Sequence, residues 1–229
     1  MGFSRTYAAT PTIERTGVER ATLVRRTYGL VFVGIVITVF GVAFCLSQPA
    51  VLAASAQHPF ITFLATFAPL WMVMRMPRSY PQNILLTLLF TFLEGIFLAP
   101  FLAYTEQRAP GVIGEAGLLT LSTFGVLSLY AMLSKRDFSA WGGFFITGLW
   151  VLFGTMILNI FLKSSLTSLW IAGAGVLVFS GLLVFDTWRI VRSGQYGPDV
   201  YVPAAVQIYL DLLNLFMFFV SLLGGGRRR

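Results

Sequence analysis

The feature that most constrains this chain is a series of long apolar runs in which Asp, Glu, Lys and Arg are almost absent. An α-helix rises about 1.5 Å per residue, so it needs about 20 apolar residues to cross about 30 Å of lipid hydrocarbon. Most of the runs have close to that length, although the second and the fourth are shorter. The sequence therefore predicts an all-α, polytopic membrane protein built as a seven-transmembrane-helix bundle. The predicted spans are residues 28–46, 60–74, 84–104, 118–133, 141–162, 169–190 and 202–223.

The composition agrees with lipid as the solvent of this chain. Hydrophobic residues make up 57% of it and charged residues 11%, whereas soluble domains carry about 25% charged residues. The net charge of +7 does not indicate a nucleic-acid partner. The basic residues lie between the apolar runs, and no basic stripe interleaved with aromatic residues follows a polar surface. The expected surroundings are a lipid bilayer, with no nucleic acid among the partners.

The distribution of Lys and Arg predicts how the bundle is oriented. The N-terminal tail and the second, fourth and sixth loops hold eleven basic residues, whereas the other three loops hold two. By the positive-inside rule, the N-terminus is cytoplasmic. The expected organisation is a cytoplasmic tail over 1–27, a transmembrane bundle over 28–223 and a short basic C-terminal tail over 224–229. Seven full crossings would place the three C-terminal arginines outside, against the same rule, so a re-entrant last span is an alternative.

Carboxylates inside the predicted spans are the main candidates for a functional site, because each charged side chain costs about 2.5–3.5 kcal/mol at mid-span on insertion scales. In the last run, Gln207, Asp211 and Asn214 follow one another at intervals of four and three residues and so share one helical face. Lipid cannot satisfy these groups, which predicts that the last helix is central. An interhelical polar seam is the favoured interpretation for Gln207 and Asn214, and a functional role is favoured for Asp211.

Two further acidic residues lie in predicted spans. Asp186 precedes Arg189 by three residues, and a local ion pair is as well supported as a functional site. The short loop between the last two spans would bring Asp186 and Asp211 to similar depth, where adjacent carboxyl groups would share one proton and latch the helices together. Glu94 lies near the middle of the third span. A neutral glutamic acid bonded to a neighbouring helix is favoured there over a residue of an ion pathway.

The sequence offers little for catalysis. The only histidine, His58, lies in a loop on the opposite side from the aspartates, and the only cysteine, Cys45, lies in the first run. A serine and histidine arrangement or a cysteine-based zinc site is therefore not available. Asp186 and Asp211 could form an aspartic-protease dyad. The surrounding FDTW and YLDL lack the GxGD and PAL motifs of presenilin-type proteases, so an intramembrane aspartyl protease is a remote alternative. We expect no enzyme and no bound cofactor.

Three motifs carry a likeness to a known family: SKRDFSAWGGFF at 134–145, VFDTWRIV at 184–191 and AAVQIYLDLLNLF at 204–216. From about Val24 onward, the chain resembles the Bax inhibitor-1 family, the transmembrane Bax-inhibitor-motif proteins, in its bacterial form. The last motif is the most specific of the three. The resemblance implies a seven-helix bundle with the last helix central, located in the bacterial cytoplasmic (inner) membrane.

The resemblance also implies an activity, a calcium leak controlled by pH. Asp186 and Asp211 match the aspartate pair that family members are thought to use as the pH-sensing gate, and a permeating Ca²⁺ ion would contact them transiently. Calcium ions or protons are therefore the expected partners. Arg75 corresponds to an arginine that assists the gate in some members. Some relatives carry a glutamate in the second helix, where this chain has none, and Glu94 on the third helix is a candidate substitute.

A different branch of the family is similar to bacterial proteins that associate with the membrane protease FtsH. This likeness provides a rival hypothesis, in which the chain is a membrane-embedded regulator that binds and modulates that protease through its polar N-terminal tail. The aspartates would then be structural. Their retention favours the leak channel.

Overall fold

The structure is a computed structural model that describes residues 17–76, 78, 80–192, 196 and 199–226. This part of the chain forms eight α-helices and no strand, which confirms the predicted all-α class. The helices are α1 Gly17–Ser47, α2 Pro49–Gln57, α3 Pro59–Arg75, α4 Gln82–Arg108, α5 Val112–Leu133, α6 Trp141–Leu162, α7 Ser165–Arg192 and α8 Tyr201–Gly226.

The second predicted span corresponds to α3, which is joined to α2 by a sharp bend at His58. The two helices meet at 97°. Pro59 occupies the start of α3, where its missing N–H is no loss, whereas inside a continuous helix its ring would clash with the preceding turn. For this reason α2 does not continue straight into α3.

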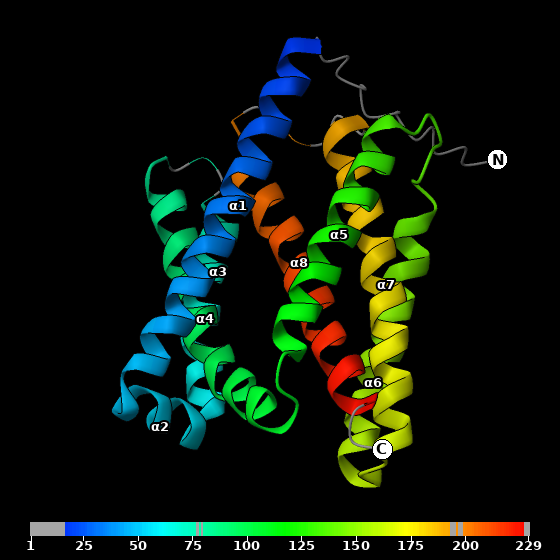
Figure 1. Ribbon diagram of the computed structural model, residues 1–229. Helices are drawn as coiled ribbons and strands as arrows, with labels where there is room; N and C mark the ends of the chain where they lie inside the picture. The colour runs from blue at the N-terminus through cyan, green and yellow to red at the C-terminus, as the bar shows by residue number, and fades with distance from the viewer. Residues whose placement is uncertain (1–16, 77, 79, 193–195, 197–198, 227–229) are drawn as a thin grey trace, which may run out of the picture.

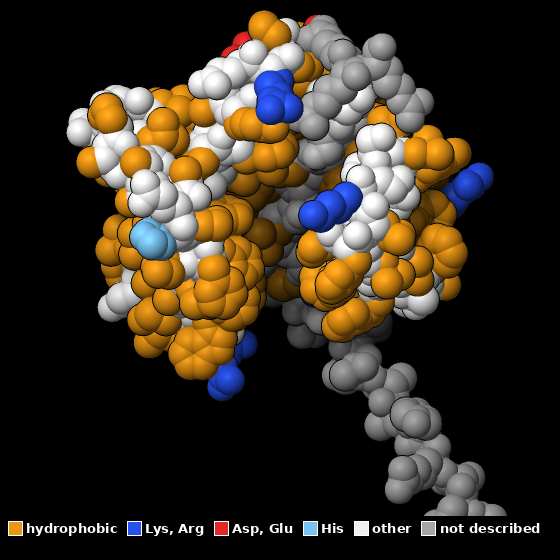
Figure 2. Space-filling view, turned by 90° about the horizontal axis from the view of Figure 1, so that it is seen from below, with side chains coloured by type: hydrophobic (Ala, Val, Ile, Leu, Met, Phe, Trp, Pro, Cys, Tyr) orange, Lys and Arg blue, Asp and Glu red, His pale blue; other side chains and the backbone are white. Residues whose placement is uncertain are grey.

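Six helices are long and apolar enough to cross a membrane, namely α1, α4, α5, α6, α7 and α8. Helix α3 has 17 residues and passes the same test only together with α2. Helix α1 begins at Gly17, before the predicted start of the first span at residue 28. Large apolar side chains such as Phe32, Trp150 and Phe161 are exposed, and hydrophobic groups cover much of the surface in Figure 2. This surface is suited to lipid contact.

Helix α8 runs obliquely between two groups of helices, with α1, α3 and α4 on one side and α5, α6 and α7 on the other (Figure 1). It packs against α1, α3, α4, α5 and α7. Helix α6 differs, because within the described part of the chain it packs against α7 alone. The polar residues of α8 therefore lie against protein on several sides, whereas most of α6 is turned outward.

Helices α1 and α4 approach each other closely because each carries a glycine where they cross. A Cβ atom at Gly41 would collide with the backbone oxygen of Phe92, and one at Gly95 would collide with the backbone oxygen of Thr38. At the same crossing, Oγ1 of Thr38 donates a hydrogen bond to the backbone oxygen of Thr91 at 3.0 Å. Backbone contact thus joins these two helices without room for side chains between them.

Candidate functional site

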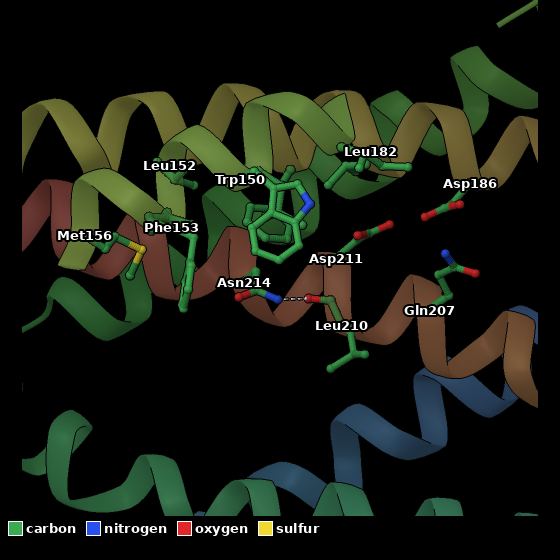
Figure 3. Close-up of a pocket in the computed structure, with 14 residues that line it drawn as sticks. Trp150, Leu152, Phe153, Met156, Leu182, Asp186, Gln207, Leu210, Asp211 and Asn214 are labelled. Atoms are coloured by element: carbon green, nitrogen blue, oxygen red, sulfur yellow. Dashed lines mark hydrogen bonds between the residues drawn. The ribbon is translucent and has the colours of Figure 1, made fainter. Parts of the chain in front are cut away.

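The structure brings together the two aspartates that the sequence places in the last two spans. Asp186 on α7 is 4% exposed and Asp211 on α8 is 5% exposed. Their carboxyl groups point toward one another across the contact between the two helices (Figure 3). Each carboxyl group is near enough to influence the charge and the hydrogen bonding of the other. A carboxyl pair therefore lies inside the helix bundle.

Arg189 offsets part of the negative charge of this pair. Its Nη1 donates to Oδ1 of Asp186 at 3.3 Å, which is the ion pair that a spacing of three residues on one helix allows. Its Nη2 donates to Oε1 of Gln207 on α8 at 3.3 Å. The guanidinium group therefore links α7 to α8. With both aspartates ionised, the three side chains carry two negative charges and one positive charge.

Tyr196, in the connection between α7 and α8, also belongs to this cluster, although the sequence did not indicate it. Its buried hydroxyl accepts a hydrogen bond from Arg189 and donates one to Oε1 of Gln207 at 2.8 Å. Burial raises the pKa of Tyr196, so its phenol stays neutral and keeps its donor proton at physiological pH. Tyr196 lies between the predicted spans, where the sequence has no hydrophobic period that singles this tyrosine out.

Helix α1 contributes a second contact that the sequence did not indicate. The hydroxyl oxygens of Tyr28 and Thr187 lie 2.9 Å apart, and Thr187 directly follows Asp186. Tyr28 also lies near enough to Asp211 to be affected by its charge. The hydroxyl pair thus joins α1 to α7 beside the two carboxyl groups.

The polar face of α8 divides between two environments. Gln207 accepts hydrogen bonds from Arg189 and Tyr196 and so belongs to the interhelical network. Asn214 instead donates from Nδ2 to the backbone oxygen of Leu210 on its own helix at 2.7 Å (Figure 3). Its side chain lines a cavity. Only Gln207 therefore takes part in the polar seam that the sequence suggests for both residues.

The cavity lies beside the carboxyl pair, among α6, α7 and α8, and has a volume of about 660 Å³. Asp186 and Gln207 mark one end of it, and Phe153 and Met156 lie toward the other (Figure 3). Its size is within the range of small-molecule sites. The carboxyl pair thus borders a space that an ion or a ligand could occupy. The lining residues are Ile146, Leu149, Trp150, Leu152, Phe153, Met156, Phe179, Leu182, Asp186, Gln207, Leu210, Asp211, Asn214 and Phe218.

Glu94 belongs to a different cluster. Tyr209 and Asp211 are two residues apart on α8 and therefore point to opposite sides of that helix. The hydroxyl of Tyr209 lies 2.7 Å from Oγ1 of Thr38 on α1, and the charge of Glu94 on α4 acts on this tyrosine. Glu94 is buried, and its Oε2 has no hydrogen-bond partner within the described residues. The structure therefore places Glu94 apart from the aspartate pair.

Arg75 is placed at the exposed end of α3. Its guanidinium group lies over the ring of Trp71, 5.0 Å from the ring centre, in a cation–π contact. Among the described residues, the only ion pair to either aspartate comes from Arg189. The contact that the family resemblance suggested for Arg75 is therefore made by another arginine in this conformation.

The carboxyl pair offers few ligands for a resident metal ion. The described part of the chain contains no group of three or more His, Cys, Asp or Glu side chains that could hold one. Calcium usually takes six to eight oxygen ligands, and the pair with Gln207 and Asn214 supplies fewer. These residues suit a passing cation that keeps part of its water better than a permanently bound one.

Comparisons with known proteins agree over nearly the whole chain. Residues 20–228 match the family model described as Inhibitor of apoptosis-promoting Bax1. Bax inhibitor 1 of Schizosaccharomyces pombe is 33% identical over 220 residues, which cover 94% of this chain and 80% of that protein. An uncharacterized membrane protein of Vibrio cholerae is 32% identical over 220 residues, with 95% of both chains covered. Protein lifeguard 4 of Mus musculus is 26% identical over 207 residues, with 89% and 85% covered.

Proposed function

Because the chain belongs to the Bax inhibitor-1 family, we propose that it is a pH-sensitive leak channel for calcium or similar cations, gated by Asp186 and Asp211. It is an integral membrane protein with several apolar helices. We place it in a bacterial cytoplasmic membrane, because a bacterial membrane protein matches it over 95% of both chains. Calcium ions and protons are the proposed partners, and no cofactor is proposed.

The observation that supports this proposal best is the buried carboxyl pair between α7 and α8, next to a cavity of about 660 Å³. Ionisable groups are costly within a membrane, and their presence there favours a role in ion or proton movement. Asp186 and Asp211 also lie on two different helices. A change in their charge therefore changes the force between the two helices, which is what a gate requires.

The proposed gate depends on one proton. Two adjacent carboxyl groups in a region of low dielectric tend to share a proton, because two full charges at short distance repel each other. Losing that proton leaves Asp186 and Asp211 both charged, with Arg189 as a single counter-charge. A divalent cation can replace the proton and bridge the carboxylates. Protonation and cation binding thus shift the balance between two packings of α7 against α8.

The proposed topology has seven spans, with the bent α2 and α3 pair as one of them and α8 at the centre of the bundle. Contacts of α8 with five other helices, α1, α3, α4, α5 and α7, support the central position. The excess of basic residues in alternate loops supports a cytoplasmic N-terminus.

An aspartyl protease is disfavoured as an alternative function. The ion pair with Arg189 occupies Asp186, whereas a protease dyad needs its two carboxyl groups free to activate water.

The decisive experiment measures calcium flux into proteoliposomes that contain the purified protein. We expect Asp211→Asn to lower the calcium flux at least about tenfold, since a charged group of the pathway is removed. The matched control is Asp137→Asn, because Asp137 is exposed and only accepts a hydrogen bond from the backbone of Ser139. Deletion of residues 1–16 tests the rival hypothesis that the protein regulates the FtsH protease, which would need that tail. Normal flux in Asp211→Asn would contradict the gate. A regulator has no ion path, so the absence of flux from the wild type and from the deletion alike would favour the regulator.

A further inference from the structure

We propose that the cavity among α6, α7 and α8 is a binding site for a single-chain lipophilic amine, an alkyl chain with one ammonium group, that enters from the bilayer. The ammonium group would lie against Asp186 and Asp211, and the chain would extend along α6 and α8. The inference uses the aspartates of the proposed gate but does not depend on ion flux.

The lining of the cavity has the shape and polarity of such a molecule. In Figure 3, Asp186, Gln207 and Asp211 lie toward one end, and Phe153 and Met156 lie toward the other. The side chains on α8 run from Gln207 to Phe218, a length of about 16 Å along the helix axis, which an extended alkyl chain of about a dozen carbon atoms would cover. One end is therefore polar and acidic, and the remainder is apolar except for Asn214, whose Nδ2 is already bonded to the backbone oxygen of Leu210.

The charge of the cluster favours an amine over other amphiphiles. The ammonium group would take the place of the proton that the two aspartates share. With both aspartates ionised, Arg189 neutralises one of the two charges, so one further positive charge would balance the site. Oδ2 of Asp211 is buried and has no hydrogen-bond partner among the residues that the structure describes. An ammonium group has three N–H donors and would supply charge-assisted hydrogen bonds to such oxygens. A fatty acid would add negative charge, and a fatty alcohol would leave the imbalance.

Helix α6 provides the route from the bilayer. In the described part of the chain it packs only against α7, and two of its cavity-lining side chains, Trp150 and Phe153, are more than half exposed. The cavity is therefore not closed off along α6. A chain dissolved in the bilayer could slip in along this helix without crossing an aqueous phase.

The test is a binding measurement with radiolabelled dodecylamine on the full-length protein in lipid nanodiscs. We expect saturable binding that unlabelled dodecylamine displaces and that dodecanol and dodecanoate do not displace at the same concentrations. Asp211→Asn should weaken the binding at least tenfold. Equal displacement by all three compounds, or no loss of affinity in Asp211→Asn, would show simple partitioning into the apolar surface and would overturn the inference.

A pair of matched variants tests the position of the alkyl chain. Met156 lines the cavity and Ile157 does not, yet both are 42% exposed on α6. Met156→Trp should shorten the cavity and weaken dodecylamine binding at least fivefold, while the binding of the shorter octylamine changes little. Ile157→Trp should leave the binding of both amines unchanged. Equal effects of the two variants would overturn the inference.

The binding measurement also separates this inference from the proposed leak channel. Amine binding without calcium flux would refute the leak channel alone, and calcium flux without amine binding would refute this site alone.

Discussion

Two buried acidic clusters lie on opposite sides of α8, and they are built differently. The Asp186 and Asp211 pair has a charged partner in Arg189 and borders a cavity. Glu94 acts on Tyr209, whose hydroxyl lies 2.7 Å from Oγ1 of Thr38, near a crossing where two glycines bring α1 and α4 into backbone contact.

The difference shows what a buried carboxyl group needs in order to act as a switch. At the aspartate pair, a change of charge acts between two helices, and the adjacent cavity leaves room for movement. At Glu94, burial is the only influence on the carboxyl group and no second carboxyl group acts on it, although Thr38 and Tyr209 line a second cavity of about 330 Å³. A change of charge there does not act between two carboxyl groups on different helices. We therefore propose that the first cluster carries the pH response and that the second is structural.

The largest expected contrast is in the pH dependence of calcium flux. Asp186→Asn and Asp211→Asn should each change the pH dependence of the remaining flux and shift its midpoint, because the carboxyl group that is left titrates alone and no longer shares a proton with a neighbour. Glu94→Gln should keep the pH dependence of the wild type. Flux in proteoliposomes between pH 5 and pH 8 checks this. A flat profile for Glu94→Gln would show that both clusters respond to pH and would break the comparison.

A substitution at the α1–α4 crossing should have the largest effect on stability. Gly95→Val places side-chain atoms against the backbone of α1, and overpacking of this kind costs about 3 kcal/mol. The free energy of unfolding in detergent micelles is the measurement. Gly29→Val is the control, because a Cβ at Gly29 meets nothing within 4 Å. Equal losses in the two variants would mean that valine itself, and not the crossing, is responsible.

Arg189→Gln should destabilise the protein by about 2 kcal/mol, because it leaves Asp186 buried without its ion-pair partner. Adding Asp186→Asn should restore part of that loss, since the uncompensated charge is then removed. A double-mutant cycle on the free energy of unfolding measures the coupling between the two residues. Additive losses would indicate that the ion pair at 3.3 Å contributes nothing to stability.

The smallest effects are expected from two tyrosines, one in each cluster. Tyr196→Phe removes the hydrogen bond to Gln207, and Tyr209→Phe removes the one to Thr38, at a cost of about 1 kcal/mol each. Only Tyr196→Phe should also shift the midpoint of the pH dependence, because Tyr196 contacts Arg189. The same change at the exposed Tyr130 is the control. A shift of the midpoint in Tyr209→Phe would refute the separation of the two clusters.

The sequence predicted the elements that depend on local properties. Each of the seven apolar runs lies in a helix of the structure, although the second becomes α3 of a bent pair. The spacing between Asp186 and Arg189 also predicted the ion pair, since residues three apart share one face of any helix. The short connection between α7 and α8 explains why the two aspartates were expected to meet.

Other parts of the site were beyond sequence reasoning. Tyr196 lies outside the helices, where no hydrophobic period indicates that its side chain is buried. The match of Arg75 to an arginine of the gate came from resemblance, and the structure places its side chain over Trp71 instead. Glu94 was considered as a supporting residue of the ion pathway, but it lies on the other side of α8 from the pair.

By itself, the sequence determined that this chain is a membrane-embedded helix bundle with acidic groups inside its spans, because hydropathy and helical period are properties of each segment alone. Only the tertiary structure decided which acidic groups meet. The rotation of each helix about its axis depends on the packing between helices, as at Gly41 and Gly95. That packing placed two aspartates together beside a cavity and left the glutamate apart from them, near Tyr209.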